Sequence, residues 1–182
     1  MPSIPLNRLP LTDGVVMVRA LDARDAQALA TASQDPEILR WTLIEEGLTA
    51  SRVQAWIDEV TRDMESGGTV RLAIVDGATD AVVGQVGLAP EWNESTGELF
   101  YWLAAPARGR RLTARAVRLV AAWALSELGM ARVEICVDAR NGPSLGVARA
   151  AGFVEEGMLR SAQRFKGERI DTVVFSRLPH DP

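Results

Sequence analysis

The chain has 182 residues, of which 47% are apolar and 24% charged, and its formal net charge is −4. This composition excludes a globally disordered chain, and no apolar run approaches the ~20 residues of a membrane-spanning helix. One cysteine, Cys136, and one histidine, His180, exclude an internal disulfide framework and a multi-cysteine zinc site, and argue against a histidine-based triad. Residues 1–14 lack the apolar core of a secretory signal, so we expect a cytoplasmic, metal-free domain.

The predicted elements begin with an irregular, Pro-rich arm over residues 1–14. Hydrophobic periodicity, caps and turn signals then predict helices at 22–33, 49–66, 113–128 and 141–152, and strands at 15–21, 70–76, 81–88, 98–103, 132–138, 153–163 and 168–177. This order favours an α/β (α+β) fold with one mixed, mostly antiparallel sheet of about seven strands and helices on both faces. We expect a single domain spanning residues 1–182.

Charge is divided unevenly along the chain. Residues 1–107 carry a net charge of −9, whereas residues 108–182 carry +5. One part of the surface is therefore expected to attract cations and the other anions, although scattered solvated charge gives the same numbers.

A basic loop over residues 105–111 joins a predicted strand to a predicted helix. It contains Arg108, Arg110 and Arg111, and Gly109 permits close approach of the backbone. The N-terminus of a helix exposes unpaired N–H groups and carries partial positive charge. The segment is therefore suited to a pyrophosphate, and an Arg-rich solvated turn is the alternative.

A second polar segment follows the predicted strand at 132–138. Asn141 and Ser144 stand three residues apart at the start of a short predicted helix. They could be simple helix caps. At the open end of a strand they could instead hold a ligand chain and donate a proton.

Taken together, the two segments resemble the GCN5-related N-acetyltransferases (GNAT), and among them the branch of the ribosomal-protein-alanine N-acetyltransferases. The resemblance covers about residues 11–178. The motifs that carry it are Glu98-Leu99-Phe100-Tyr101-Trp102-Leu103, Arg108-Gly109-Arg110, Asn141 with Ser144, and Ala151-Gly152-Phe153 followed by Glu156-Gly157-Met158-Leu159-Arg160. It implies the GNAT fold and transfer of an acetyl group from acetyl-CoA to a primary amine by direct attack, with positioning and proton handling supplying most of the rate gain.

The resemblance also implies a donor site. Backbone N–H groups of residues 108–114 would hold the pyrophosphate. The splayed strand ending at Trp102-Leu103 would pair with the pantetheine amides, and Asn141 would hydrogen-bond that arm. The predicted donor-site residues are Trp102, Leu103, Arg108, Gly109, Arg110, Arg111, Leu112, Thr113, Ala114, Asn141 and Ser144. The loop departs from the family pattern at Arg111, where Gly is expected, and at Thr113, where Gly or Ala is expected. The Arg111 side chain either crowds the pyrophosphate or binds it.

The resemblance implies catalytic roles for two side chains. Ser144 would protonate the leaving thiolate, and Glu98 would act as the general base through water. Glu91 and Glu94 are alternative bases, all three glutamates could be surface carboxylates, and an amine that arrives neutral needs no base. The predicted acceptor-side residues are Trp41, Glu91 and Tyr101, while Cys136 is expected to pack in a buried strand.

Two other functions stay open on the sequence alone. An aminoacyl-tRNA could be the donor, its backbone held by basic side chains of the loop and the helix after it: Arg108, Arg110, Arg111, Arg115 and Arg118. The second open function is that of a non-catalytic module that binds a CoA ester. The acceptor could be a protein N-terminus, an antibiotic amine, a polyamine or an amino acid, and the fold is compatible with a homodimer.

Overall fold

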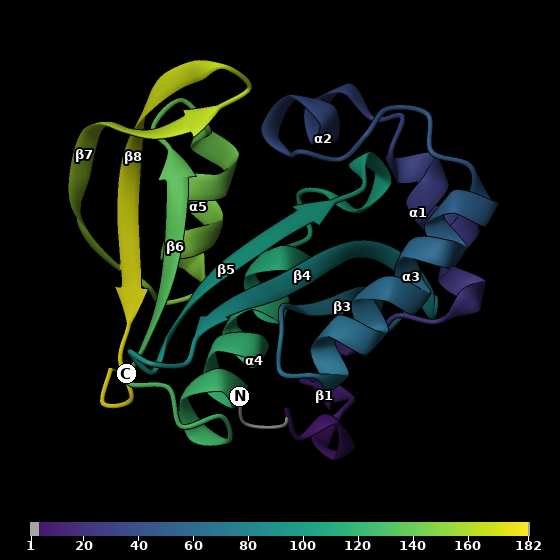
Figure 1. Cartoon of the computed structure of the whole chain (residues 1–182), viewed down its shortest axis with the longest axis horizontal. Helices are drawn as coiled ribbons and strands as arrows, with labels where there is room; N and C mark the ends of the chain where they lie inside the picture. The colour runs from purple at the N-terminus through teal and green to yellow at the C-terminus, as the bar shows by residue number, and fades with distance from the viewer. Residues whose placement is uncertain (1–3, 182) are drawn as a thin grey trace.

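Eight strands form one mixed sheet in the order β1-β2-β3-β4-β5-β6-β8-β7 in the computed structural model, which describes residues 4–181 (Figure 1). The strands are β1 (Leu11–Thr12), β2 (Val16–Ala20), β3 (Val70–Asp76), β4 (Ala81–Glu91), β5 (Thr96–Leu103), β6 (Arg132–Asp138), β7 (Val154–Phe165) and β8 (Glu168–Arg177). All neighbouring strands pair antiparallel except β5 and β6, which pair in parallel. The expected mixed, mostly antiparallel architecture is confirmed.

Helices cover both faces of the sheet (Figure 1). They are α1 (Ala26–Ala32), α2 (Pro36–Trp41), α3 (Ala50–Glu65), α4 (Leu112–Ser126) and α5 (Gly142–Ala150). Because side chains alternate along a strand, β3 contributes to two cores. Leu72 and Ile74 pack in the cluster that contains α4, whereas Ala73 and Val75 pack in the cluster that contains α1 and α3.

The arm and the first helical region differ from the expectation. The arm, whose residues 1–3 lie outside the described part, contains a short 3-10 helix (Leu6–Arg8) and β1, which pairs with β2 and becomes the eighth strand. The helix expected over 22–33 begins as a 3-10 turn (Ala23–Asp25) before α1. Helix α2 lies between the helices expected at 22–33 and 49–66, where no helix is expected from the sequence. Asp35 caps the helix, its carboxylate accepting the Glu37 N–H at 2.9 Å, and proline occupies the first helical position.

A fork between β5 and β6 is the feature that positions the site. The two parallel strands pair only where Thr96–Glu98 faces Arg132–Glu134. Beyond that point β5 stays paired with β4 as far as Leu103, and β6 stays paired with β8 as far as Asp138. The strands therefore separate toward their C-terminal ends, where the basic loop and the start of α5 lie (Figure 1).

Candidate active site

A cavity of about 720 Å³, here called the fork cleft, occupies the space between the separated ends of β5 and β6. Its walls come from β5, β6, α2, the basic loop and first turn of α4, the start of α5 and the β7–β8 hairpin. The predicted donor-site residues that line it are Trp102, Leu103, Arg108, Gly109, Arg111, Leu112, Thr113, Ala114, Asn141 and Ser144. The fold thus brings together segments separated by more than a hundred residues.

The basic loop enters α4 through two left-handed residues. Gly109 has φ of 79°, and Arg111, the N-cap of α4, has φ of 61° and ψ of 14°. A non-glycine residue in this conformation is unusual and strained, which explains why the family pattern has glycine there. No side chain of residues 4–181 caps α4, so the first-turn N–H groups are left for an anion in the cleft.

The three arginines of the loop have different surroundings. Arg110 does not line the cleft: its guanidinium binds buried Asp76 at 2.5 and 3.1 Å, which lowers the pKa of that carboxyl. Arg108 binds Asp35 at 2.5 Å and the Leu103 carbonyl at 3.1 Å. The Arg111 guanidinium makes no hydrogen bond or ion pair within residues 4–181, so it is the loop guanidinium left for a phosphate; the Arg111 carbonyl accepts the Arg115 N–H at 3.2 Å.

Asn141 and Ser144 meet Tyr101 at the start of α5. The Asn141 side-chain oxygen accepts the Ser144 N–H at 3.2 Å, so Asn141 is a helix cap. Its amide NH₂ has no acceptor among the described residues and can donate to a ligand. The Tyr101 hydroxyl lies 3.0 Å from Ser144 Oγ and donates to the Ser144 carbonyl at 3.2 Å. Burial raises the pKa of Tyr101 to about 12, so it stays protonated at neutral pH. Tyr101 was expected to contact the acceptor, whereas the structure places it against the predicted acid.

Glu98 lies on the opposite face of the sheet from Tyr101. Tyr101 packs in the cluster with α4, whereas Trp102, which shares a face with Glu98, packs in the cluster with α1 and α3. Glu98 lines the cleft where β5 and β6 part, stays open to solvent on one side, and has a pKa raised by burial and by the like charge of Glu134. The two predicted catalytic groups therefore face the cleft from opposite sides.

Cys136 lies beside Glu98 in the cleft wall, half-buried. Burial and the nearby carboxylates raise the pKa of its thiol to about 12. A thiol that remains protonated at neutral pH is a poor nucleophile, which agrees with the expected packing role.

The expected acceptor residues are only partly brought together. Trp41 lines the cleft from α2, and its indole N–H donates to Glu37 at 3.1 Å. Glu91 does not line the cleft: it is exposed at the end of β4, where the β4–β5 hairpin closes, and Glu94 lies in that turn. Both lie at the closed end of the fork, away from the residues that line the cleft. Of the three candidate bases, the structure brings only Glu98 to the cleft.

Sequence reasoning missed the contribution of α2 and of the β7–β8 hairpin. Glu37 and Ile38 line the cleft from α2, and Gln163, Phe165 and Ile170 line it from the hairpin. The Asp-Pro capping signal could have revealed α2. No local signal shows that the hairpin reaches the cleft, because that depends on the pairing of β8 with β6. No helix in the described chain is long and apolar enough to cross a membrane, and residues 4–181 contain no cluster of three potential metal ligands.

Comparison with known proteins agrees with this geometry. The acetyltransferase (GNAT) domain family matches residues 16–154. The uncharacterized N-acetyltransferase p20 of Bacillus licheniformis is 26% identical over 165 residues, which is 90% of this chain and 93% of that protein. The ribosomal-protein-S5-alanine acetyltransferase of Vibrio fischeri superposes with a TM-score of 0.81 at 19% identity, covering 95% of this chain and 98% of that one.

A third solved structure holds a coenzyme. RimL, a ribosomal L7/L12 alpha-N-protein acetyltransferase in complex with coenzyme A, superposes with a TM-score of 0.80 at 18% identity, covering 93% of this chain and 97% of that one. The fold and the family match define the class: this chain belongs to the GNAT acetyltransferase family. It is therefore an N-acetyltransferase, as the sequence resemblance implied.

Proposed function

We propose that the protein transfers the acetyl group of acetyl-CoA to a primary amine at the fork between β5 and β6. The observation that carries the proposal is that the uncapped start of α4, the Ser144–Tyr101 pair and Glu98 all open into one cleft. A pyrophosphate site and a proton donor suit this transfer, and the carboxylate can take the proton from an amine that arrives charged.

The donor fits the side of the cleft formed by α4 and α5. The pyrophosphate accepts hydrogen bonds from the backbone N–H groups of residues 108–114 and forms an ion pair with the Arg111 guanidinium. The open edge of β5, where the backbone groups of Tyr101 and Leu103 face away from β4, pairs with the pantetheine arm, and the amide NH₂ of Asn141 donates to it. The Leu103 carbonyl already accepts a hydrogen bond from Arg108 at 3.1 Å, which leaves the Leu103 N–H and the second lone pair of the carbonyl for the pantetheine arm.

The acceptor fits the opposite side, next to Glu98. The amine nitrogen attacks the thioester carbonyl, an N–C bond forms, and the C–S bond breaks. Ser144 donates its hydroxyl proton to the departing thiolate and regains a proton from solvent water, while the Tyr101 hydroxyl, 3.0 Å away, holds Ser144 Oγ in position. Glu98 accepts the proton released by the amine, through water. Its raised pKa improves its match to that task.

A tRNA donor is less well supported. Of the five arginines expected to hold its backbone, four have partners within the chain. They are Arg108 with Asp35, Arg110 with Asp76, Arg115 with Asp13 and Arg118 with the Ala150 carbonyl. A polyanion would have to displace these partners, whereas a single pyrophosphate needs only Arg111 and backbone N–H groups.

Isothermal titration with acetyl-CoA, followed by an assay of released thiol with small-molecule and peptide amines, tests the proposal. We expect one-to-one binding and thiol release that is insensitive to ribonuclease. Absence of acetyl-CoA binding at millimolar concentration contradicts the proposed donor, and activity abolished by ribonuclease supports the tRNA alternative. The cytoplasmic location and the homodimer remain predictions from the sequence.

A further inference from the structure

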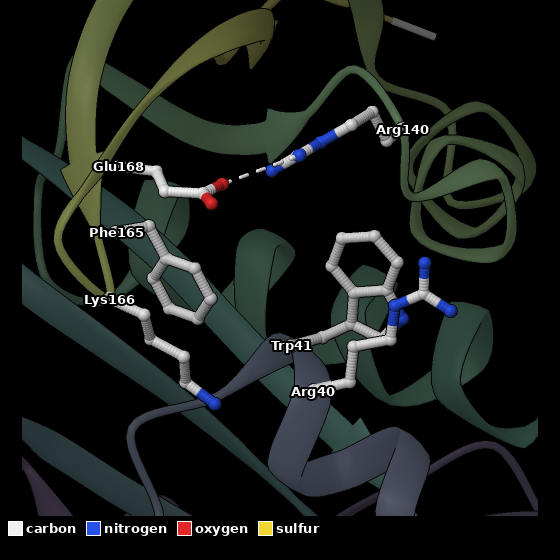
Figure 2. Close-up of a pocket in the computed structure, with 6 residues that line it drawn as sticks. All are labelled: Arg40, Trp41, Arg140, Phe165, Lys166 and Glu168. Atoms are coloured by element: carbon white, nitrogen blue, oxygen red, sulfur yellow. Dashed lines mark ion pairs between the residues drawn. The ribbon is translucent and has the colours of Figure 1, made fainter.

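A second cavity of about 260 Å³ adjoins the fork cleft, and Figure 2 shows the residues that line it. The residues that line this aromatic side pocket are Arg40, Trp41, Arg140, Phe165, Lys166 and Glu168. Trp41 and Phe165 line the fork cleft as well, so the two cavities share these rings as a common boundary. An acceptor whose amine lies near Glu98 can therefore extend between the two rings.

The chain holds the two rings on opposite sides of the pocket (Figure 2). Trp41 is the last residue of α2, and Phe165 is the last residue of β7. The β7–β8 turn is two residues long, both with positive φ of 48° and 87°, which is the geometry of a tight hairpin. Lys166 in that turn donates a hydrogen bond to the Leu39 carbonyl in α2. This bond ties the hairpin to α2, so the pocket is formed before any ligand enters.

Ionic charge does not decide what this pocket binds. Three cations surround it, but Arg40 lies 3.7 Å from Glu37, and Arg140 binds Asp138 at 2.7 Å and lies 3.7 Å from Glu168. Lys166 is the third cation. The three positive charges are balanced by three carboxylates, those of Glu37, Asp138 and Glu168. The pocket therefore has no strong preference for an anion.

The rings themselves favour one class of ligand. The Arg40 guanidinium lies 4.7 Å from the centre of the Trp41 ring, and the Lys166 ammonium lies 5.4 Å from the centre of the Phe165 ring. Each ring thus already interacts with a cation. A ligand cation placed between the rings would be repelled by the Arg40 guanidinium and by the Lys166 ammonium. A neutral planar ring meets no such cost and gains stacking contacts with Trp41 and Phe165.

We infer that the aromatic side pocket binds a planar aromatic ring carried by the acceptor amine. The inference rests on the proposed function and narrows its substrate class, because it excludes polyamines and other polycations from this pocket. The volume is sufficient, since a cavity of about 150 Å³ in another protein admits benzene.

The test compares three primary amines on the same backbone. Phenylalanine amide and cyclohexylalanine amide have the same carbon skeleton, but only phenylalanine amide has a planar ring. The third amine, 4-(aminomethyl)phenylalanine amide, carries an added cation on its planar ring. Binding is measured by titration in the presence of CoA, and acetylation with acetyl-CoA. The ring variants are Trp41→Leu and Phe165→Leu. The control is Trp56→Leu, because Arg71 also lies over that indole, at 5.8 Å, yet Trp56 lines neither cavity.

We expect the native protein to prefer phenylalanine amide over cyclohexylalanine amide by about two- to tenfold per stacked ring, and to bind the cationic amide more weakly than either. Trp41→Leu and Phe165→Leu should reduce this preference, and Trp56→Leu should keep it. Equal binding of the planar and saturated amides, a preference that survives both ring variants, or no binding of any amide overturns the inference. Titration of acetyl-CoA on the same samples separates the two claims, because acetyl-CoA binding without ring preference leaves the proposed function intact.

Discussion

Replacing Arg111 with glycine should separate the two effects of this residue, since it is both the strained N-cap of α4 and the loop guanidinium without an internal partner. Its φ of 61° costs a non-glycine residue about 1–2 kcal/mol, whereas glycine loses about 0.5–1 kcal/mol more backbone entropy on folding. The free energy of unfolding of Arg111→Gly should therefore stay the same or rise by about 1 kcal/mol.

Affinity for acetyl-CoA should change in the opposite direction. A hydrogen bond to a charged group contributes about 1.5–3 kcal/mol, so losing the Arg111–phosphate contact should raise Kd by about 10- to 150-fold. Arg111→Asn tolerates the left-handed conformation without the charge and should show the same loss, which excludes glycine flexibility as the cause. Thermal unfolding and isothermal titration measure the two quantities on the same samples.

Arg110→Gln is the matched control for this experiment. The Arg110 side chain binds Asp76 outside the cleft. Its loss should lower Tm, because buried Asp76 loses its partner, and should leave acetyl-CoA affinity within about twofold. Equal or tighter binding of acetyl-CoA by Arg111→Gly would refute the reasoning, since the side chain would then only crowd the site.

Three further substitutions test the proposed proton transfers. Ser144→Ala should lower kcat by about 10²- to 10⁴-fold with little change in stability, because Asn141 caps α5 through the Ser144 backbone N–H; full turnover would remove Ser144 as the acid. Tyr101→Phe keeps the ring but loses both hydroxyl contacts, so kcat should fall by about tenfold at unchanged acetyl-CoA affinity, and an unchanged kcat would make Tyr101 a packing residue. Glu98 must be unprotonated to act as a base, and its pKa is raised. Activity should therefore rise with pH through a midpoint above the ordinary glutamate value of about 4.3, and Glu98→Gln should abolish that limb; identical pH profiles would argue against a base at this position.

Local patterns were sufficient to predict much of the sheet. The ranges 70–76, 132–138 and 168–177 agree with β3, β6 and β8, because their apolar runs end at clear turn signals. The position of the basic loop could be predicted as well, because the apolar strand before it and the apolar helix after it have clear ends. The short strand β1 could not be foreseen, because two residues carry no period and depend on the edge of β2 for pairing.

Side-chain direction was the part that the sequence could not supply. Arg110 and Arg111 are adjacent and chemically identical, yet one is held outside the cleft by Asp76 and the other is left for a ligand. Tyr101 and Trp102 are also adjacent, and strand alternation places them on opposite faces of the sheet. Which face belongs to the donor depends on the packing of α4 and α5, which is set by tertiary contacts.

A crystal structure of the protein with acetyl-CoA tests the central claim most directly. We predict the pyrophosphate at the N–H groups of residues 108–114 with Arg111 on a phosphate oxygen, the thioester sulfur within hydrogen-bond reach of Ser144 Oγ, and the acetyl carbonyl at the fork next to Glu98. Acetyl-CoA bound elsewhere, or bound with its thioester away from the β5–β6 fork, would contradict the account.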